Sequence, residues 1–184
     1  MNGMSTTLLL IIIFLLIGGF IAAYMFISYT SAENPSRIPN GIYILRGDRF
    51  EPLQISGAYI PREPGYYFLY FHNNLCPHCQ TFYPKWIDYL RKEGGVFRNI
   101  TVIEVVCDWF TERCSSDPAR STFQLYRISQ SPSFLLIKIG LNRSVDVVDI
   151  GAEYSKLKNE GKISTEEFEP SYIDVIVRRY ITPI

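Results

Sequence analysis

Two of the four cysteines in this sequence, Cys76 and Cys79, are separated by only two residues. A C-x-x-C pair is typical of a redox dithiol, because one thiolate can attack a disulfide and the second thiol can resolve the mixed disulfide that forms. The same spacing also supplies half of a zinc site. A third interpretation is two inert buried cysteines that are close by coincidence.

The pair lies where a strand is followed by a helix. The run YYFLYF at 66–71 is short, aromatic and bounded by turn residues, which predicts a buried strand. After the cysteines, Phe82, Trp86 and Leu90 recur at four-residue spacing, and a Gly-Gly pair ends the pattern. We therefore expect the cysteine pair at the N-terminus of this helix.

That position favours thiol chemistry, because the helix macrodipole and the unpaired backbone N–H groups both stabilise a thiolate. The first cysteine of such a pair is usually the exposed one, so we expect Cys76 to be the nucleophile and Cys79 the resolving thiol. Pro77 suits the first helical turn, where its missing N–H costs little. His78 can donate to the Cys76 sulfur or lie beside it as a cation. This would make the pair a stronger oxidant, with His78 as a tuning residue rather than a general base.

A metal site is the weaker alternative. Zinc ribbons need a second C-x-x-C pair after roughly 15 to 20 residues, whereas Cys107 and Cys114 have six residues between them. His72 and His78 add no recognised ligand spacing. We therefore predict no metal and no cofactor.

Cys107 and Cys114 are expected to form a structural disulfide. Closing so short a loop would stabilise the fold by about 2–3 kcal/mol in the chain-entropy model. Two free thiols, or a relay with the first pair, remain alternatives.

The rest of the chain alternates between strand and helix patterns. Strands are predicted at 41–45, 100–107, 133–140 and 144–150, with the last two antiparallel. Helices are predicted at 117–128, with Asp117 as N-cap, and at 170–181. Between the strands at 41–45 and 66–71, prolines predict an irregular chain from residue 50 onward. Residues 154–169 are expected to be a solvated excursion without function. The order predicts an α/β domain over 41–184 with a central mixed sheet flanked by helices.

A membrane segment is predicted before this domain. Residues 7–29 contain no charged side chain. This run is longer than the approximately 20 apolar residues that are needed to cross a bilayer. We expect a transmembrane anchor over 1–30 and a linker over 31–40. A cleaved signal peptide is the alternative, although this apolar run is longer than usual and lacks a basic n-region.

The membrane side is indicated by two opposing signals. Arg37, Arg46 and Arg49 follow the span and no basic residue precedes it, which favours a cytoplasmic domain. A disulfide between Cys107 and Cys114 would favour an oxidising compartment. We expect a single-pass membrane protein with an extracytoplasmic domain.

The charges are balanced, with 18 basic and 18 acidic residues among 184, and no basic run occurs. A nucleic-acid partner is therefore not predicted.

Three features resemble the thioredoxin-like superfamily. The CPHC motif at 76–79 is identical to that of bacterial periplasmic disulfide oxidants. Pro84 matches the helix-kinking proline of thioredoxins, and Ser131-Pro132 matches the family's cis-proline. The resemblance covers 66–151 and implies a thioredoxin-like fold.

The resemblance also implies an activity: a membrane-anchored thiol–disulfide oxidoreductase that acts on protein thiols and disulfides and is recharged by an unidentified redox partner. The backbone of Ser131, beside Pro132, would pair with an extended substrate segment. Two positions depart from the family. Tyr70 stands where a buried acid is usual, which puts a carboxylate relay to Cys79 in doubt, and Leu75 replaces a tryptophan. A reductase, facing the cytoplasm or supplying electrons outside, and a non-enzymatic metal-binding or adaptor module are the alternatives.

Overall fold

The computed structural model describes residues 15–19, 37–164 and 167–181, and the chain forms two units, Met1–Arg37 and Ile38–Ile184. In the first unit, residues 15–19 are helical and exposed. The rest of the membrane span predicted at 7–29 lies outside the described residues. Within the described ranges, no helix combines the length and the apolar character needed to cross a membrane.

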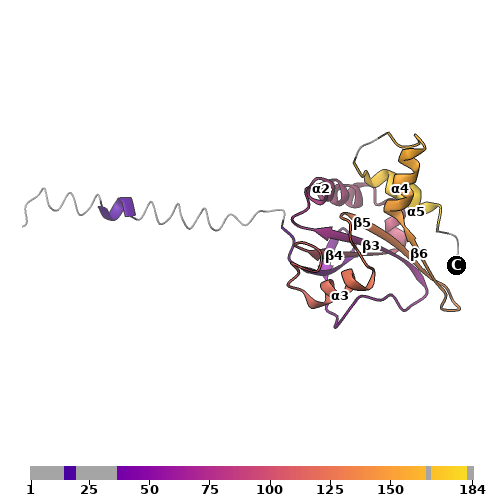
Figure 1. The fold of residues 1–184 in the computed structure, drawn as a ribbon, viewed down its shortest axis with the longest axis horizontal. Coiled ribbons are helices and arrows are strands. Elements are labelled where there is room, and N and C mark those ends of the chain that lie inside the picture. Colours follow the sequence, from indigo (N-terminus) through magenta and orange to yellow (C-terminus); the bar gives the residue numbers. More distant parts are fainter. Residues whose placement is uncertain (1–14, 20–36, 165–166, 182–184) are drawn as a thin grey trace, which may run out of the picture. The chain divides into compact units, whose positions relative to one another are not determined.

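The second unit is built on a six-stranded sheet (Figure 1). The strands run in the order β2-β1-β4-β3-β5-β6. β3 and β4 are parallel, and every other neighbouring pair is antiparallel. The mixed α/β sheet predicted from the sequence is therefore confirmed. The bounds are β1 Gly41–Arg46, β2 Arg49–Pro52, β3 Gly65–Asn73, β4 Thr101–Cys107, β5 Ser133–Ile139 and β6 Val145–Asp149.

Helices cover both faces of the sheet (Figure 1). One face carries α2 (Pro77–Lys92), α4 (Ile150–Asn159) and α5 (Pro170–Arg178), and the other carries α3 (Asp117–Leu125). A short 3-10 helix, η1 (Gly95–Asn99), leads from α2 into β4.

The central strand β3 explains why this arrangement forms. Its residues alternate between the two cores: Phe68 and Tyr70 pack with Trp86 of α2, whereas Leu69 and Phe71 belong to the cluster on the α3 side. All four strand residues are fully buried. A strand buried on both faces reads as a continuous apolar run, which is the pattern seen at 66–71.

The structure corrects two predictions before and at α3. Residues 49–52, predicted as irregular, form β2 and pair with β1 at the edge of the sheet. Pro52 ends this strand, which is a position that an edge strand tolerates. The N-cap of α3 is Ser116 rather than Asp117, because the Ser116 side chain accepts a hydrogen bond from the Ala119 amide at 3.4 Å.

The segment predicted as a solvated excursion is also different. Ile150, Tyr154 and Leu157 are buried on one side of α4. Their spacing of four and then three residues is helical. The charged residues between them concealed this pattern in the sequence.

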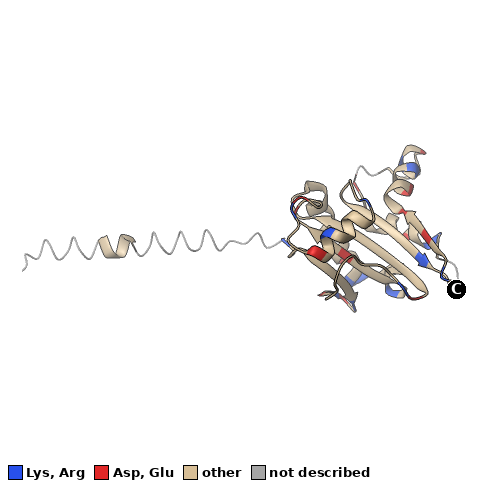
Figure 2. Ribbon diagram, turned by 60° about the horizontal axis from the view of Figure 1, so that its bottom comes forward, with Lys and Arg blue, Asp and Glu red and all other residues tan. Residues whose placement is uncertain are grey.

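Basic and acidic residues are interspersed along the elements of this unit rather than gathered by sign (Figure 2). This distribution agrees with the balanced composition of the chain.

Candidate active site

The C-x-x-C pair lies at the start of α2, at the carboxyl end of β3. Cys76 is the N-cap residue of the helix, and Pro77 occupies its first turn. The Cys76 amide donates to the Asn73 carbonyl at 3.0 Å, and the Gln80 amide donates to the Cys76 carbonyl at 3.1 Å. These two bonds join the strand end to the first helical turn and fix the direction of the Cys76 side chain.

The two sulfur atoms meet the loop before β5. Cys76 Sγ donates to the Ser131 carbonyl at 3.3 Å, and Cys79 Sγ shares a 2.9 Å hydrogen bond with Ser131 Oγ. The Ser131–Pro132 peptide bond is cis, which is the geometry that the family resemblance implies. The fold therefore brings together two segments more than fifty residues apart in the sequence.

The first thiol is less accessible than we expected. Cys76 is 5% exposed and Cys79 is fully buried. Of the two residues, only Cys76 keeps any exposed surface. The contact with the Ser131 loop accounts for this burial.

Burial raises the pKa of the Cys79 thiol to about 12, although the hydrogen bonds from Ser131 and from the Asn73 backbone act in the opposite direction. Cys79 is therefore a protonated thiol at neutral pH. To act as a nucleophile it must transfer its proton to a neighbouring group.

The tuning role of His78 stays a prediction. Its side chain is exposed, and no hydrogen bond joins it to the Cys76 sulfur in the part of the chain that the structure describes. It lines a cavity of about 190 Å³ on the same side as the cis peptide, together with Phe82, Ser131, Pro132, Glu167 and Phe168.

A buried polar pair lies beneath the cysteines. The Tyr70 hydroxyl and His72 Nδ1 are 2.9 Å apart and share a hydrogen bond. Burial lowers the pKa of His72 to about 4, so the imidazole is neutral at neutral pH. Burial, followed by the charges of Cys79 and Glu104, raises the pKa of Tyr70 well above its ordinary value. Tyr70 therefore lies close to both Cys79 and a buried acid.

That acid, Glu104, is the residue that the sequence analysis missed. It pairs in register with Tyr70 across β3 and β4 and is fully buried. Burial raises its pKa to about 8. The nearby Tyr83 of α2 lowers the pKa of Glu104 in part. Among the described residues, however, neither carboxylate oxygen of Glu104 has a hydrogen-bond partner of standard geometry. The sequence signal that could have identified Glu104 is that it is the single acidic residue inside the apolar run ITVIEVVC at 100–107.

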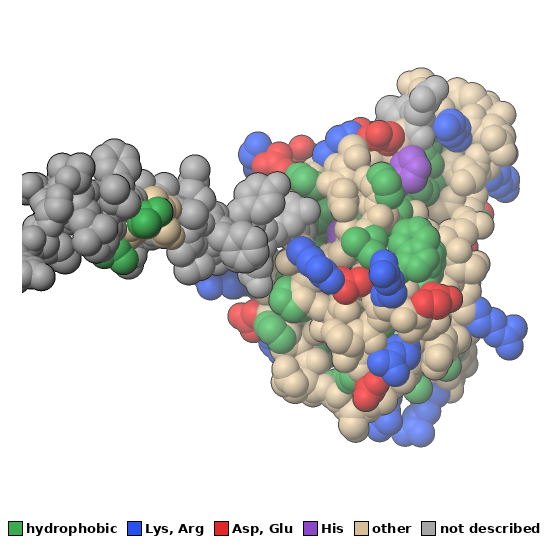
Figure 3. Space-filling view, turned by 60° about the vertical axis from the view of Figure 1, so that its left-hand side comes forward, with side chains coloured by type: hydrophobic (Ala, Val, Ile, Leu, Met, Phe, Trp, Pro, Cys, Tyr) green, Lys and Arg blue, Asp and Glu red, His purple; other side chains and the backbone are tan. Residues whose placement is uncertain are grey.

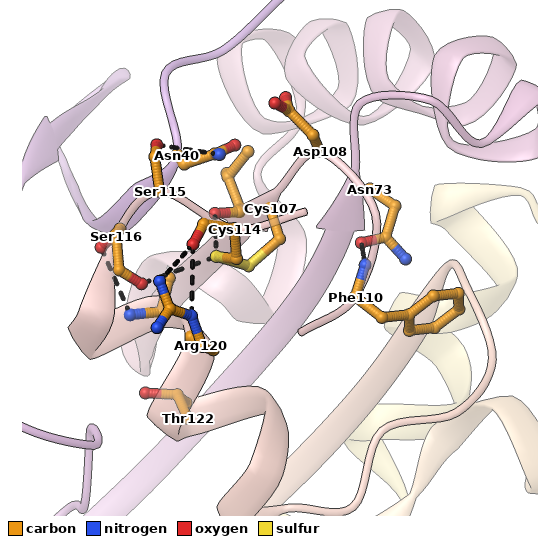
Figure 4. The surroundings of a disulfide bond; sticks show 12 residues. Asn40, Asn73, Cys107, Asp108, Phe110, Cys114, Ser115, Ser116, Arg120 and Thr122 are labelled. Carbon is orange, nitrogen blue, oxygen red and sulfur yellow. Dashed lines mark hydrogen bonds between the residues drawn. A yellow bond between two sulfur atoms is a disulfide. The ribbon is translucent and has the colours of Figure 1, made fainter. Parts of the chain in front are cut away.

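The second cysteine pair forms a disulfide between Cys107, at the end of β4, and Cys114 (Figure 4). Arg120 of α3 donates from Nε and Nη2 to the Cys114 carbonyl at 3.2 and 2.7 Å. Both cysteines belong to the apolar cluster on the α3 side of the sheet. This pair is therefore built into the core, on the other side of the sheet from the C-x-x-C helix.

Among the described residues, no group of three His, Cys, Asp or Glu side chains is placed to hold a metal ion.

Comparison with known proteins gives a structural likeness. No protein-family model matches the chain, and no curated protein matches it. The chain is similar to the crystal structure of thioredoxin from Aeropyrum pernix, with a TM-score of 0.45 and 16% sequence identity. The match covers 79% of this chain and 98% of the thioredoxin chain.

Proposed function

We propose that this protein is a thioredoxin-like thiol–disulfide oxidoreductase that works through Cys76 and Cys79. The observation that supports it most strongly is the meeting of both sulfur atoms with one residue, Ser131, at the N-terminus of α2. Two thiols at a helix N-terminus, one slightly exposed and one fully buried, are suited to sequential attack and resolution.

The reaction exchanges two electrons between dithiol and disulfide. The Cys76 thiolate attacks one sulfur of a substrate disulfide, forms a mixed disulfide, and releases the other substrate sulfur, which takes up a proton. Cys79 then loses its proton and attacks the Cys76 sulfur. The substrate leaves as a dithiol, and the protein is left with a Cys76–Cys79 disulfide. Run in reverse, the same steps oxidise a substrate dithiol.

The proton of Cys79 needs an acceptor within the core. Glu104 supplies a buried carboxyl group on the strand next to β3, in register with Tyr70. We therefore assign the ionised form of Glu104 as the acceptor, and because its pKa is raised to about 8, resolution by Cys79 should become faster as pH rises toward that value. Tyr70 stands at the position where the family carries a buried acid. In this proposal Glu104, on the neighbouring strand, supplies the carboxylate instead.

Direction and location are part of the proposal. The CPHC sequence supports an oxidant, and the Cys107–Cys114 disulfide supports an oxidising, extracytoplasmic compartment for a domain anchored by residues 7–29. A reductase is distinguished by its redox potential. A value near −120 mV would support the oxidant, and one near about −270 mV would support the reductase.

The test of the activity is disulfide exchange by the full-length chain with bis(2-hydroxyethyl) disulfide. Cys76→Ser should reduce the rate by roughly a thousandfold or more, because the substitution removes the nucleophile. Full activity in this variant would overturn the proposal.

A further inference from the structure

A groove lies between α2 and the β1–β2 hairpin, on the part of the sheet away from β5. Two adjoining cavities of about 320 and 510 Å³ form this groove. Both cavities are lined by the same four residues, Leu45, Asp48, Leu90 and Arg91. The C-x-x-C cysteines and the loop before β5 line neither cavity, so the groove is separate from the reactive sulfur atoms.

The walls of the groove are apolar. Leu45 and Phe50 of the hairpin line the smaller cavity together with Ile87 and Leu90 of α2. Exposed apolar side chains are common on protein surfaces, and Figure 3 shows them among basic and acidic side chains on one face of this unit. An apolar wall alone therefore does not identify a ligand, whereas the polar groups at the two ends of the groove do.

Glu104 lies at the inner end of the groove. It lines the smaller cavity and is fully buried, and neither of its carboxylate oxygens has a hydrogen-bond partner of standard geometry among the described residues. Burial raises the pKa of Glu104 to about 8, so at neutral pH the group is mainly a neutral carboxylic acid with an O–H to donate. A buried donor without an acceptor is costly, and an oxygen atom of a ligand would remove that cost.

The two strands beside Glu104 leave this donor available. Tyr43 of β1 and Tyr70 of β3 lie in register with Glu104 on either side of it. The Tyr43 hydroxyl donates to the Pro39 carbonyl at 2.7 Å, and the Tyr70 hydroxyl shares a 2.9 Å hydrogen bond with His72. Both phenols are therefore engaged elsewhere.

Two arginines lie at the outer end of the groove. Arg91 lines both cavities and Arg98 lines the larger one, and both residues are exposed. Neither arginine forms an ion pair in the part of the chain that the structure describes, whereas Arg49, which lines the smaller cavity, lies 3.9 Å from the Asp48 carboxylate. The outer end therefore carries positive charge, which disfavours an ammonium ligand and favours a carboxylate.

The inner and outer ends are close enough for one small molecule to reach both. Burial and then the charge of Glu104 raise the pKa of Tyr83, whereas the positive charge of Arg91 lowers it. The Tyr83 phenol, which also lines the smaller cavity, thus lies near both groups.

We propose that this groove binds a small apolar carboxylate that carries a carbonyl oxygen at its other end. The carboxylate pairs with Arg91 and Arg98, the apolar body lies against the walls, and the carbonyl accepts a hydrogen bond from the Glu104 carboxyl. The site is tested by binding alone, so its failure is distinct from failure of the proposed exchange activity.

The test is a titration of the full-length chain with 4-acetylbenzoate at neutral pH, followed by NMR shifts of backbone amides. Two analogues each lack one polar end: 4-ethylbenzoate has no carbonyl, and acetophenone has no carboxylate. We expect 4-acetylbenzoate to bind about tenfold more tightly than 4-ethylbenzoate, which is typical of one hydrogen bond. It should bind about threefold more tightly than acetophenone, because the arginines are exposed.

Variants assign each preference to its end of the groove. Glu104→Leu should abolish the preference for 4-acetylbenzoate over 4-ethylbenzoate, and Glu104→Gln, which keeps an N–H donor, should retain part of it. Replacing both Arg91 and Arg98 by methionine should abolish the preference over acetophenone. The matched control is Lys92→Met, which removes a basic side chain of α2 that lines neither cavity and should leave both ratios unchanged.

The affinity for 4-acetylbenzoate should also depend on pH. Above about pH 8 it should fall more steeply than the affinity for 4-ethylbenzoate, because ionised Glu104 has no proton to donate. The other titratable groups around Glu104 are Tyr43, Tyr70 and Tyr83, and burial raises the pKa of each, so they stay protonated in this range.

Equal affinities of the wild-type chain for 4-acetylbenzoate and 4-ethylbenzoate would overturn the site. Absence of saturable binding would do the same, as would shifts confined to amides outside α2 and the β1–β2 hairpin. These outcomes need only the wild-type chain and the three probes, so a variant that fails to fold does not leave the proposal undecided.

Discussion

The two cysteine pairs lie at the same end of neighbouring parallel strands, yet they have different chemical states. Cys76 and Cys79 follow β3 and are free thiols whose sulfur atoms face Ser131. Cys107 ends β4, Cys114 lies in the loop after it, and the two form a disulfide that packs in the α3-side core. The comparison shows that position in the fold decides which pair is suited to exchange. One pair begins a helix beside a polar loop, and the other closes a loop against apolar side chains.

Strand β4 contributes to both environments. Glu104 lies in register with Tyr70, on the face covered by α2, whereas Cys107 lies in the cluster beneath α3. The strand thus supplies a titratable group to the free pair and a structural anchor to the bonded pair.

The largest predicted effect on stability concerns the titratable group. The pKa of Glu104 rises from 4.5 to about 8, which corresponds to roughly 5 kcal/mol. Below pH 4.5 the group is protonated in both the folded and the unfolded state. Between these two values only the folded protein keeps the proton, so the free energy of unfolding falls as pH rises, and the loss is complete above about pH 8. Urea unfolding at a series of pH values measures this slope.

Glu104→Gln removes the titrating group while keeping its shape, so this part of the decline with pH should disappear. The variant should also slow the release of a mixed disulfide by Cys79 at about pH 8 and above, where the ionised Glu104 carboxylate is the assigned proton acceptor. Asp174→Asn, which changes a buried acid on α5, is the control and should leave that release rate unchanged. A Glu104→Gln protein with the wild-type pH slope would contradict the assignment.

The next effect separates the roles of the two pairs. Replacing both Cys107 and Cys114 by serine should lower the free energy of unfolding by about 2–3 kcal/mol, because the loop is no longer closed in the unfolded chain. Exchange with bis(2-hydroxyethyl) disulfide should continue through Cys76. Loss of exchange in a variant that is still folded, as judged by circular dichroism, would show that the second pair takes part in the chemistry.

The smallest effect tests the partner of the free pair. In the wild-type protein the Ser131 hydroxyl shares a 2.9 Å hydrogen bond with Cys79 Sγ, and this bond lowers the pKa of the thiol. Ser131→Ala removes that hydroxyl. We expect the pKa of Cys79 to rise further, and the release of a mixed disulfide to slow by about threefold to tenfold, which is the range expected for one hydrogen bond. Ser133→Ala, two residues along, is the control. A rate unchanged by Ser131→Ala would remove this hydrogen bond from the account.

Local patterns were sufficient for the elements that hold the free pair. The apolar run of β3 and the four-residue spacing of Phe82, Trp86 and Leu90 placed Cys76 at a helix start, where the structure has it. The contact with Ser131 could not follow from local spacing, because it depends on how β5 pairs with β3. The family resemblance indicated only that the cis-proline faces the cysteine pair, and it assigned the Ser131 backbone to a substrate.

Register was the other missing information. Glu104 faces Tyr70 because β3 and β4 pair in parallel, and Leu75 meets Asp108 for the same reason. A pattern within one segment does not state which residue of the next strand lies opposite. The short edge strand β2 was missed because none of its residues is fully buried, and α4 was missed because charged residues lie between its buried positions.

The most direct test of the central claim is to trap the mixed disulfide. The Cys79→Ser variant of the full-length chain is incubated with a disulfide-containing peptide, and the modified cysteine is then mapped by mass spectrometry. The account predicts a stable peptide adduct on Cys76, because attack occurs and resolution does not. An adduct on Cys107 or Cys114, or no adduct at all, would contradict it.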